Sequence, residues 1–348
     1  MKINFSYSIL LSLILTACSK KESVDPEPQI YQFAVPANFP RPVFDIENAM
    51  TREGIELGRM LFYDVRLSGN NKVSCASCHD QKLAFSDGKA LSNAGVSGTI
   101  LHRHAPALVN LAWANNGLFW DGGGTNLESQ AFGPLAATDE MHQDLFELVD
   151  ELNTVPEYVK QFDLAFKDQI SSQNIVKALA QFQRTLVSAN SRYDKFKRNE
   201  AGGNLSLMEL RGLELVRQKC QSCHTGELFT DNAYHNNGID ADFSNDQSEG
   251  LFQGRFRISY NPADMGSFKT PTLRNAALTA PYMHDGRFTK LEDVIDHYSG
   301  EIKVSPTLDK TIPTNGFQFN PDEKKAIMAF LNTLTDEEFV TNRELSRP

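Results

Sequence analysis

Apolar side chains recur at helical spacing along much of the chain. In residues 173–196 they stand three and four positions apart, as at Ile175, Leu179, Phe182 and Leu186, and residues 144–166 carry the same pattern. Residues 322–334 (DEKKAIMAFLNTL) predict a closing amphipathic helix whose acidic first turn suits the positive end of the helix dipole. Strand-like alternation is scarce. The pattern therefore predicts a mostly α fold with long loops between helices.

A weak internal repeat suggests two similar modules. Residues 52–58 (REGIELG) resemble residues 210–216 (LRGLELV), and both carry apolar residues at helical spacing. The polar stretch 198–204, which contains Gly202 and Gly203, is the best linker between them. The chain has 348 residues, which leaves room for two domains at roughly 100 to 200 residues each. We therefore expect two tandem domains, over residues 41–200 and 201–348.

The composition is that of a globular protein with an acidic surface. Hydrophobic residues make up 41% of the chain and charged residues 22%, so a buried core is expected. The formal net charge is −10. Because phosphate backbones are bound by clustered Lys and Arg, this charge argues against nucleic acid or an anionic lipid surface as the main partner. A basic or neutral partner fits better.

The first residues have the pattern of an export signal. Lys2 precedes an apolar run at residues 9–15 that is too short to span a bilayer. The run ends in LTAC at residues 15–18, which resembles a bacterial lipobox, so Cys18 would carry a lipid. The alternative is an ordinary cleaved signal with an incidental cysteine. We expect a lipoprotein signal peptide at residues 1–17, a tether at 18–40, and a periplasmic protein that meets the membrane only through its lipid anchor.

The other cysteines stand in two CxxCH motifs. The chain has five cysteines, and Cys18 leaves four, in CASCH at residues 75–79 and CQSCH at residues 220–224. CxxCH is the attachment motif of c-type haem: two thiols bond to the vinyl groups and the adjacent histidine binds the iron. A redox or zinc site is the alternative, but zinc needs further ligands at suitable spacing. The motifs predict two covalent haem c groups, attached through Cys75, Cys78, Cys220 and Cys223, with axial His79 and His224.

Further motifs lie between and after the two CxxCH sequences. They are FWDG at residues 119–122, ESQA at 128–131, Glu140-Met141, KTPTLRN at 269–275 and APYMHDG at 280–286. In this order they resemble the bacterial di-haem cytochrome c peroxidase and MauG family, over nearly all of the mature sequence. The resemblance implies two cytochrome c-like domains, each enclosing one haem, and an oxidoreductase that acts on hydrogen peroxide.

The resemblance assigns the two haems different tasks. It implies that the haem on His79 handles peroxide, so that its far side is open or weakly filled. Glu140 matches the family's distal carboxylate, Gln130 its distal amide, and Trp120 the aromatic residue that relays electrons between the haems. The alternatives are a solvated carboxylate at a helix start for Glu140 and a core position for Trp120, as we expect for Trp113.

The second ligand of the haem on His224 separates the branches of the family. Peroxidases of the family commonly use Met, whereas MauG uses Tyr. Tyr298 stands fourteen residues after His284 of the HDG element, where the family has this ligand. Met283 and Met265 are the competing candidates. The neighbouring His297 is expected to be solvated.

Two positions depart from the family pattern. Some family peroxidases carry a distal His in the loop that matches residues 92–97, but this loop has none, and His102 or His104 would have to substitute. The family also binds calcium between the haems, through backbone oxygens that match Thr279 and Pro281 and an Asn that matches His104. Because calcium prefers oxygen ligands, a His there puts the ion in doubt. His284 and Asp285 are expected to be structural residues between the haems.

Three functions remain open. The leading one is a di-haem peroxidase that reduces hydrogen peroxide with electrons from a small cytochrome c or cupredoxin. The second is a MauG-like oxidation of side chains in a partner protein, which Tyr298 and the loop without His favour. The third is a non-catalytic electron-transfer cytochrome, in which both irons would be six-coordinate and Glu140 and Gln130 would have no reaction partner.

Overall fold

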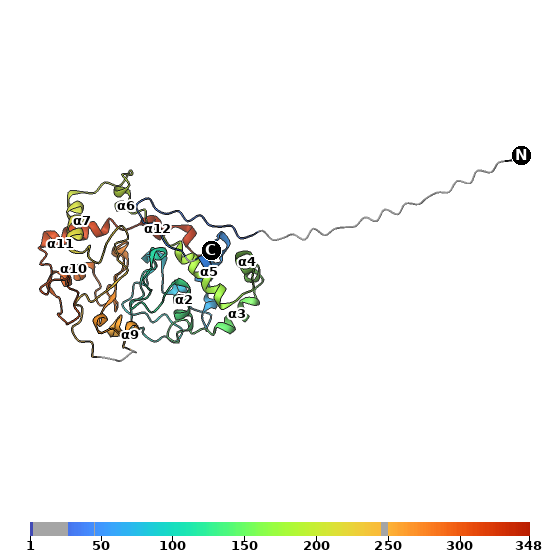
Figure 1. Ribbon diagram of the computed structural model, residues 1–348, viewed down its shortest axis with the longest axis horizontal. Coiled ribbons are helices and arrows are strands. Elements are labelled where there is room, and N and C mark those ends of the chain that lie inside the picture. Colours follow the sequence, from blue (N-terminus) through green and yellow to red (C-terminus); the bar gives the residue numbers. More distant parts are fainter. Residues whose placement is uncertain (3–26, 45, 245–249) are drawn as a thin grey trace.

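The computed structural model describes residues 1–2, 27–44, 46–244 and 250–348, and it is mostly helical, as predicted (Figure 1). The predicted signal peptide and Cys18 lie outside the described residues, apart from Met1 and Lys2. The α-helices are α1 (Arg52–Tyr63), α2 (Leu127–Ala136), α3 (Leu145–Asn153), α4 (Pro156–Phe166), α5 (Ser172–Arg184), α6 (Arg192–Lys197), α7 (Leu207–Lys219), α9 (Phe256–Ser259), α10 (Leu291–Gly300), α11 (Pro321–Asn332) and α12 (Glu337–Thr341). Short 3-10 helices and long loops connect them.

Strands contribute little to the described fold. Strand β1 (Tyr234–His235) pairs antiparallel with β2 (Phe268–Lys269), with Tyr234 opposite Lys269. In Figure 1, helices α2 to α5 lie together on one side of the folded body, and α7, α10 and α11 lie on the other. The arrangement follows the chain order of the two modules.

The two segments with helical spacing, 144–166 and 173–196, each form two helices. The segment 144–166 forms α3 and α4 because Pro156, which has no backbone N–H to donate, begins a new helix. The segment 173–196 forms α5 and α6. Between α5 and α6, the backbone of residues 186–188 is hydrogen-bonded to Asn110. The Asn110 N–H donates to the Leu186 carbonyl, and its side-chain amide makes two hydrogen bonds with the Ser188 backbone.

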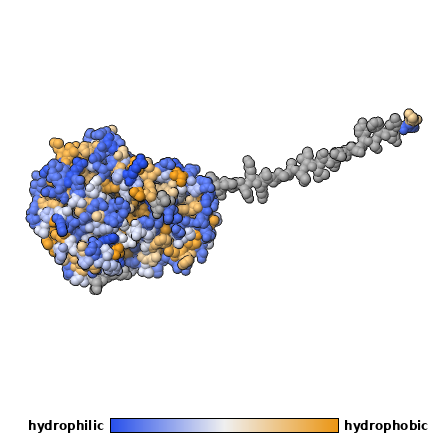
Figure 2. Space-filling view, viewed as in Figure 1, coloured by the Kyte–Doolittle hydropathy of each residue, from blue (hydrophilic) through white to orange (hydrophobic). Residues whose placement is uncertain are grey.

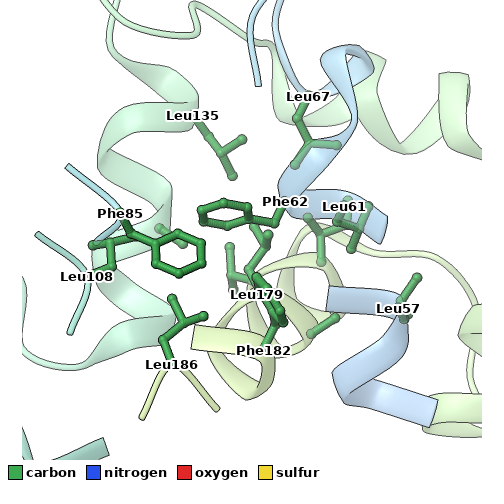
Figure 3. Packing of buried hydrophobic residues seen from close by; sticks show 14 of the residues in the cluster. Leu57, Leu61, Phe62, Leu67, Phe85, Leu108, Leu135, Leu179, Phe182 and Leu186 are labelled. Atoms are coloured by element: carbon green, nitrogen blue, oxygen red, sulfur yellow. The ribbon is translucent and has the colours of Figure 1, made fainter. Parts of the chain in front are cut away.

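The larger hydrophobic cluster belongs to the first module. Its centre is an aromatic group in which Phe62 of α1 packs edge-on against Phe85 and against Phe182 of α5 (Figure 3). Helix α1 lies directly on α5 at Gly58, where an added Cβ would stand 1.9 Å from the Ala178 carbonyl oxygen. Only glycine permits this approach of the two backbones.

The second module repeats this packing. Helix α7 lies on α11 at Gly212, where an added Cβ would stand 1.9 Å from the Ala326 carbonyl oxygen. By packing, Gly212 is the counterpart of Gly58. The sequence comparison pairs it with Gly54 instead, one helical turn earlier. The repeat is therefore present in the fold, but the structural alignment of the two helices is shifted by four residues from the alignment that the sequence suggested.

A buried ion pair joins the modules. Arg274, in the KTPTLRN motif, donates from both Nη atoms to Asp194 at 2.8 Å each, and both side chains are fully buried. Its Nε and Nη2 also donate to the carbonyl of Glu227. The guanidinium stacks over the ring of Phe39 at 4.5 Å. One arginine thereby fastens residues from both modules.

Residues 27–40 and the residues after α11 pack on the folded body. Phe339, Val340 and Leu345 join the first module's cluster although they follow α11. Residues 27–40, assigned to the tether by sequence, also reach the body. There Phe39 packs against Trp113, whose indole N–H donates to the Pro40 carbonyl. Trp113 is a buried core residue, as predicted. The domain boundaries themselves stay predictions.

The surface is mixed in character. Figure 2 shows hydrophilic residues over most of the visible face of the folded body, with hydrophobic residues in small groups between them. Such a mosaic is ordinary for a folded protein. Among the described residues, no helix is both long enough and apolar enough to cross a membrane.

Candidate functional site

The two CxxCH motifs form turns of the same shape. The backbone N–H of His79 donates to the Cys75 carbonyl at 3.0 Å, and that of His224 to the Cys220 carbonyl at 2.9 Å. Each histidine Nδ1 then donates to a phenylalanine carbonyl, from His79 to Phe85 at 2.9 Å and from His224 to Phe229 at 3.0 Å. Because a carbonyl only accepts, Nδ1 carries the proton and Nε2 keeps a lone pair that is free to bind a metal.

Both phenylalanines hold an unusual backbone conformation to do this. Phe85 has a φ of 59° and Phe229 a φ of 52°, in the left-handed region that bulky residues rarely occupy. Burial also lowers the pKa of His79 and of His224, which favours the neutral imidazole. Both histidines therefore have the tautomer and the charge that a metal ligand needs.

The cysteines and their surroundings fit covalently held haem. Cys75, Cys78, Cys220 and Cys223 are unpaired. Two of them, Cys220 and Cys223, line a largely apolar cavity of about 330 Å³ together with His224. His284 also lines this cavity, and its buried Nε2 has no hydrogen-bond partner within the described chain. A polar group of a bound haem would supply that partner, which is the fit expected of an enclosed cofactor site.

Glu140 lies near the first pair of cysteines. It stands in the turn that follows α2, where its backbone N–H donates to the Ala137 carbonyl at 3.1 Å. After burial, the charge of Glu140 contributes to the raised pKa of the Cys75 and Cys78 thiols, so the carboxylate lies within electrostatic range of both. Burial, and then the nearby Asp139 carboxylate, raises the pKa of Glu140 to about 7. Glu140 is therefore partly enclosed and is not a fully solvated carboxylate.

The loop at residues 92–97 lies against this turn. Val96 N–H donates to the Glu140 carbonyl at 2.7 Å, and Ser92 Oγ lies 3.9 Å from Cys78 Sγ. The close approach requires Gly95, because a Cβ there would stand 1.8 Å from the Asp139 carbonyl oxygen. The loop in which some relatives carry a distal His is thus beside Glu140, and here it has no imidazole.

Gln130 and Trp120 line the same cavity of about 330 Å³ as His224. Gln130 belongs to the first half of α2 and is partly buried. The Trp120 indole N–H donates to the His104 carbonyl at 2.8 Å. The His104 N–H in turn donates to the His284 carbonyl at 2.8 Å. The His284 ring stacks on Phe268, with 3.6 Å between centroids and 7° between planes. Trp120 therefore sits where residues of both modules meet.

The structure brings two of the three candidate second ligands to the His224 cavity. Tyr298 and Met283 both line it, whereas Met265 does not. Burial raises the pKa of Tyr298 to about 12, while a hydrogen bond from Asn237 acts in the opposite direction. The expectation of a solvated His297 was wrong: this residue is only 2% exposed, and its Nε2 donates to the Asn237 carbonyl at 3.0 Å. The chain folds over α10 at this point and excludes solvent.

The residues at the family's calcium position do not fit calcium. His104 Nδ1 donates to the Lys89 carbonyl at 2.7 Å, and its Nε2 lies 3.5 Å from Ser86 Oγ. Burial lowers the pKa of His104, against the opposing influence of carbonyls that include that of Thr279. The ring thus fills this place with a nitrogen donor, where calcium requires oxygen ligands. With both ring nitrogens engaged, His104 is also unsuited to bind the first haem.

Sequence reasoning missed two polar residues of the His224 cavity. His235 lies between two carboxylates, with Nε2 2.8 Å from Asp231 and Nδ1 2.6 Å from Asp309. Hydrogen bonding to Cys223, Asp309 and Asp231 raises its pKa to about 10. Asn237 follows two positions later. Side chains alternate between the two faces of a strand, so His235 and Asn237 would point to the same side if β1 continued. That signal was too weak to use, because β1 has only two residues.

Comparison with known proteins agrees with this geometry. A family model for di-haem cytochrome c peroxidase matches residues 52–202. The methylamine utilization protein MauG of Methylorubrum extorquens is 37% identical over 311 residues, covering 88% of this chain and 84% of that protein. The cytochrome c551 peroxidase of Nitrosomonas europaea is 34% identical over 288 residues, covering 81% of this chain and 80% of that protein.

Solved structures give the same answer. A MauG-like protein associated with microbial copper homeostasis has a TM-score of 0.84 and 34% identity, covering 91% of this chain and 99% of that one. The di-haem peroxidase BthA from Burkholderia thailandensis, at 23% identity and a TM-score of 0.68, shares the fold. The chain therefore belongs to the di-haem cytochrome c peroxidase and MauG family, and is an oxidoreductase that acts on peroxide with two covalent c-type haems.

Proposed function

We propose that this peroxidase reduces hydrogen peroxide at the haem held by Cys75, Cys78 and His79, with Glu140 as the acid–base residue. The observation that carries the proposal is the loop at residues 92–97, which bonds to the Glu140 carbonyl through Val96 and contacts Cys78 through Ser92. In this enclosed place burial, and then Asp139, raises the pKa of Glu140 to about 7. A carboxyl group with this pKa can both accept and return a proton at neutral pH.

The residues around the haem move protons and orient the substrate. Reduction of hydrogen peroxide to two water molecules consumes two electrons and two protons. A haem bound there would supply the coordination position and pass on the electrons. Glu140 Oε takes the proton from one peroxide oxygen and returns it to the departing oxygen. Gln130 is a neutral amide on α2, the helix that leads into the turn of Glu140, and it would orient the peroxide oxygens without adding charge.

The second haem would be held by His224 and Tyr298, because the phenol lines the same cavity as the histidine. Bound there, it would supply a second centre for oxidising equivalents. Trp120, which hydrogen-bonds to His104 at the junction of the modules, relays electrons between the haems. Two separate hydrophobic clusters support two haem domains, for which we keep the bounds 41–200 and 201–348, although Tyr193 belongs to the second cluster and residues after α11 belong to the first.

The proposed location is the periplasm. Haem attachment at CxxCH motifs and the LTAC sequence at residues 15–18 support an exported chain held to a membrane by a lipid on Cys18. Such an anchor leaves both haem domains free to meet a partner protein.

The electron source is a partner protein, and two kinds fit. In the first, a small cytochrome c or cupredoxin delivers electrons, and the chain removes peroxide. In the second, side chains of a protein substrate are oxidised, as in the MauG branch. The second is favoured by Tyr298 in the cavity, since an anionic oxygen ligand stabilises oxidised iron. The loop at residues 92–97, which has no His to occupy the first haem, also favours it.

One experiment tests the proposal. Stoichiometric hydrogen peroxide is added to the fully oxidised protein, and optical and EPR spectra are recorded over time for the wild type and for Glu140→Gln. We expect the wild type to react rapidly. The variant should react much more slowly while retaining both haems. Equal rates would remove Glu140 from the mechanism, and a wild type that does not react would leave only electron transfer.

The same spectra separate the two partner classes. If both oxidising equivalents persist for minutes and are then quenched only slowly by a reduced small cytochrome, the protein-substrate function is supported. Rapid multiple-turnover oxidation of the cytochrome supports peroxide removal instead. Tyr298→Phe serves as the ligand test, because it should change the low-spin signal of the second haem.

A further inference from the structure

A single amide contacts both side chains that could bind the second haem opposite His224. Asn237 Nδ2 lies 3.1 Å from Tyr298 Oη and 3.5 Å from Met283 Sδ. All three side chains line the cavity that contains His224. The amide therefore contacts both the phenol oxygen and the thioether sulfur that are the candidate ligand atoms.

The orientation of this amide is set by its other contacts. Asn237 Oδ1 accepts from the Ile239 backbone N–H at 3.3 Å. Because that partner is a donor, oxygen must occupy this side of the amide, and the NH₂ group must face Tyr298 and Met283. Its backbone is also held, since the Asn237 carbonyl accepts from the buried His297 at 3.0 Å. Asn237 is thus fixed as a donor toward the cavity.

A fixed N–H donor interacts more strongly with Tyr298 than with Met283. A phenolate oxygen carries negative charge and accepts a strong, charge-assisted hydrogen bond, whereas a thioether sulfur is a weak acceptor. The bond to oxygen stabilises the ligand state of tyrosine. The contact with Met283 occupies the sulfur that would otherwise be offered to the metal. Both effects act in the same direction.

We propose that Asn237 is a positioning residue that selects Tyr298 over Met283 as the ligand of the second haem. This inference rests on the proposed ligation by Tyr298. It assigns the choice between an oxygen-ligated and a sulfur-ligated haem to a residue outside the ligand set, one that reaches the cavity from the loop after β1. Removal of the amide donor should move this haem from oxygen toward sulfur ligation.

The test compares haem-loaded variants by low-temperature EPR, optical spectra and reduction potentials. Asn237→Leu keeps the size of the side chain but removes the donor. We expect a changed low-spin signal and a higher reduction potential for the second haem, with the first haem unaltered. In the double variant with Met283→Leu, no sulfur is available and the signal of sulfur ligation should be lost. Asn332→Leu is the control, because this exposed amide bonds only to Met328 within α11.

A second variant covers the case in which Asn237→Leu fails to take up haem. Asn237→Asp keeps the shape, but its carboxylate cannot donate and repels an anionic ligand, so its low-spin signal should change in the same way. If both Asn237 variants keep the wild-type signal while Tyr298→Phe alters it, the role of Asn237 is disproved and Tyr298 ligation stands. If Tyr298→Phe itself leaves the signal unchanged, the proposed ligation fails, and the inference fails with it.

Discussion

Arg274 and Asp194 form a fully buried ion pair, joined by two hydrogen bonds of 2.8 Å, between the two modules. Removing one partner would leave the other charge buried without compensation, which typically costs about 3–5 kcal/mol. We therefore expect Arg274→Met to lower the free energy of unfolding by about that amount. Denaturant unfolding, followed by haem absorbance and circular dichroism, measures the loss.

Two control variants test whether the loss comes from the buried charge. The double variant Arg274→Met with Asp194→Leu removes both charges and should recover part of the loss. Arg211→Ala disrupts an exposed pair with Glu214 and should cost only about 0–1 kcal/mol. A loss for Arg274→Met no larger than that for Arg211→Ala would contradict the structural role of the pair.

The peroxide reaction should depend on pH through Glu140. The group must begin deprotonated to take a proton, and its pKa is raised to about 7. The rate should therefore be low in acid, rise with pH through about 7 and level off above it. Stopped-flow mixing with peroxide measures this profile. Glu140→Gln should slow the reaction by roughly 10²- to 10⁴-fold and abolish the inflection.

Asp139→Asn tests the cause of this pKa. The Asp139 carboxylate contributes to the raised pKa of Glu140, after burial. Its removal should move the inflection to lower pH while leaving the plateau rate unchanged. An unmoved inflection would mean that another group controls the profile.

The two glycines at the helix crossings should not tolerate alanine. A Cβ at Gly58 or Gly212 would stand 1.9 Å from a backbone carbonyl oxygen of the facing helix. Backbone cannot yield as a side chain does, so each change should destabilise the protein by about 1–3 kcal/mol or more, despite the better helix propensity of alanine. Thermal unfolding checks this. Gly300→Ala in α10, whose nearest atom would be 3.6 Å away, is the matched control and should be neutral.

Calcium removal should have no effect on this protein. His104 fills the position with hydrogen bonds to Lys89 and Ser86, so no ion is needed to hold Trp120 and His284 together. Incubation with a strong chelator should leave the unfolding temperature, both haem spectra and the peroxide rate unchanged. Loss of the peroxide reaction on chelation, restored by calcium, would show that His104 does not replace the ion.

Part of the fold and site could be read from local patterns. The helical class follows from apolar spacing, which needs only neighbouring residues. The haem attachment residues follow from CxxCH, because the chemistry requires two thiols and an imidazole within five positions. Trp113 was correctly expected in the core. The motif order indicated the family that the comparisons then established.

The remaining features depend on residues that are distant in the chain. The register of the repeat became visible only when Gly58 and Gly212 met their facing carbonyls on α5 and α11. His297 was expected in solvent, yet the loop after β1 covers it and places Asn237 between Tyr298 and Met283, sixty-one and forty-six residues away in the chain. Spacing along the chain indicates two candidate ligands, Tyr298 and Met283. The contact of both with the Asn237 amide, on which we base the proposed choice between them, arises from tertiary packing that no local pattern contains.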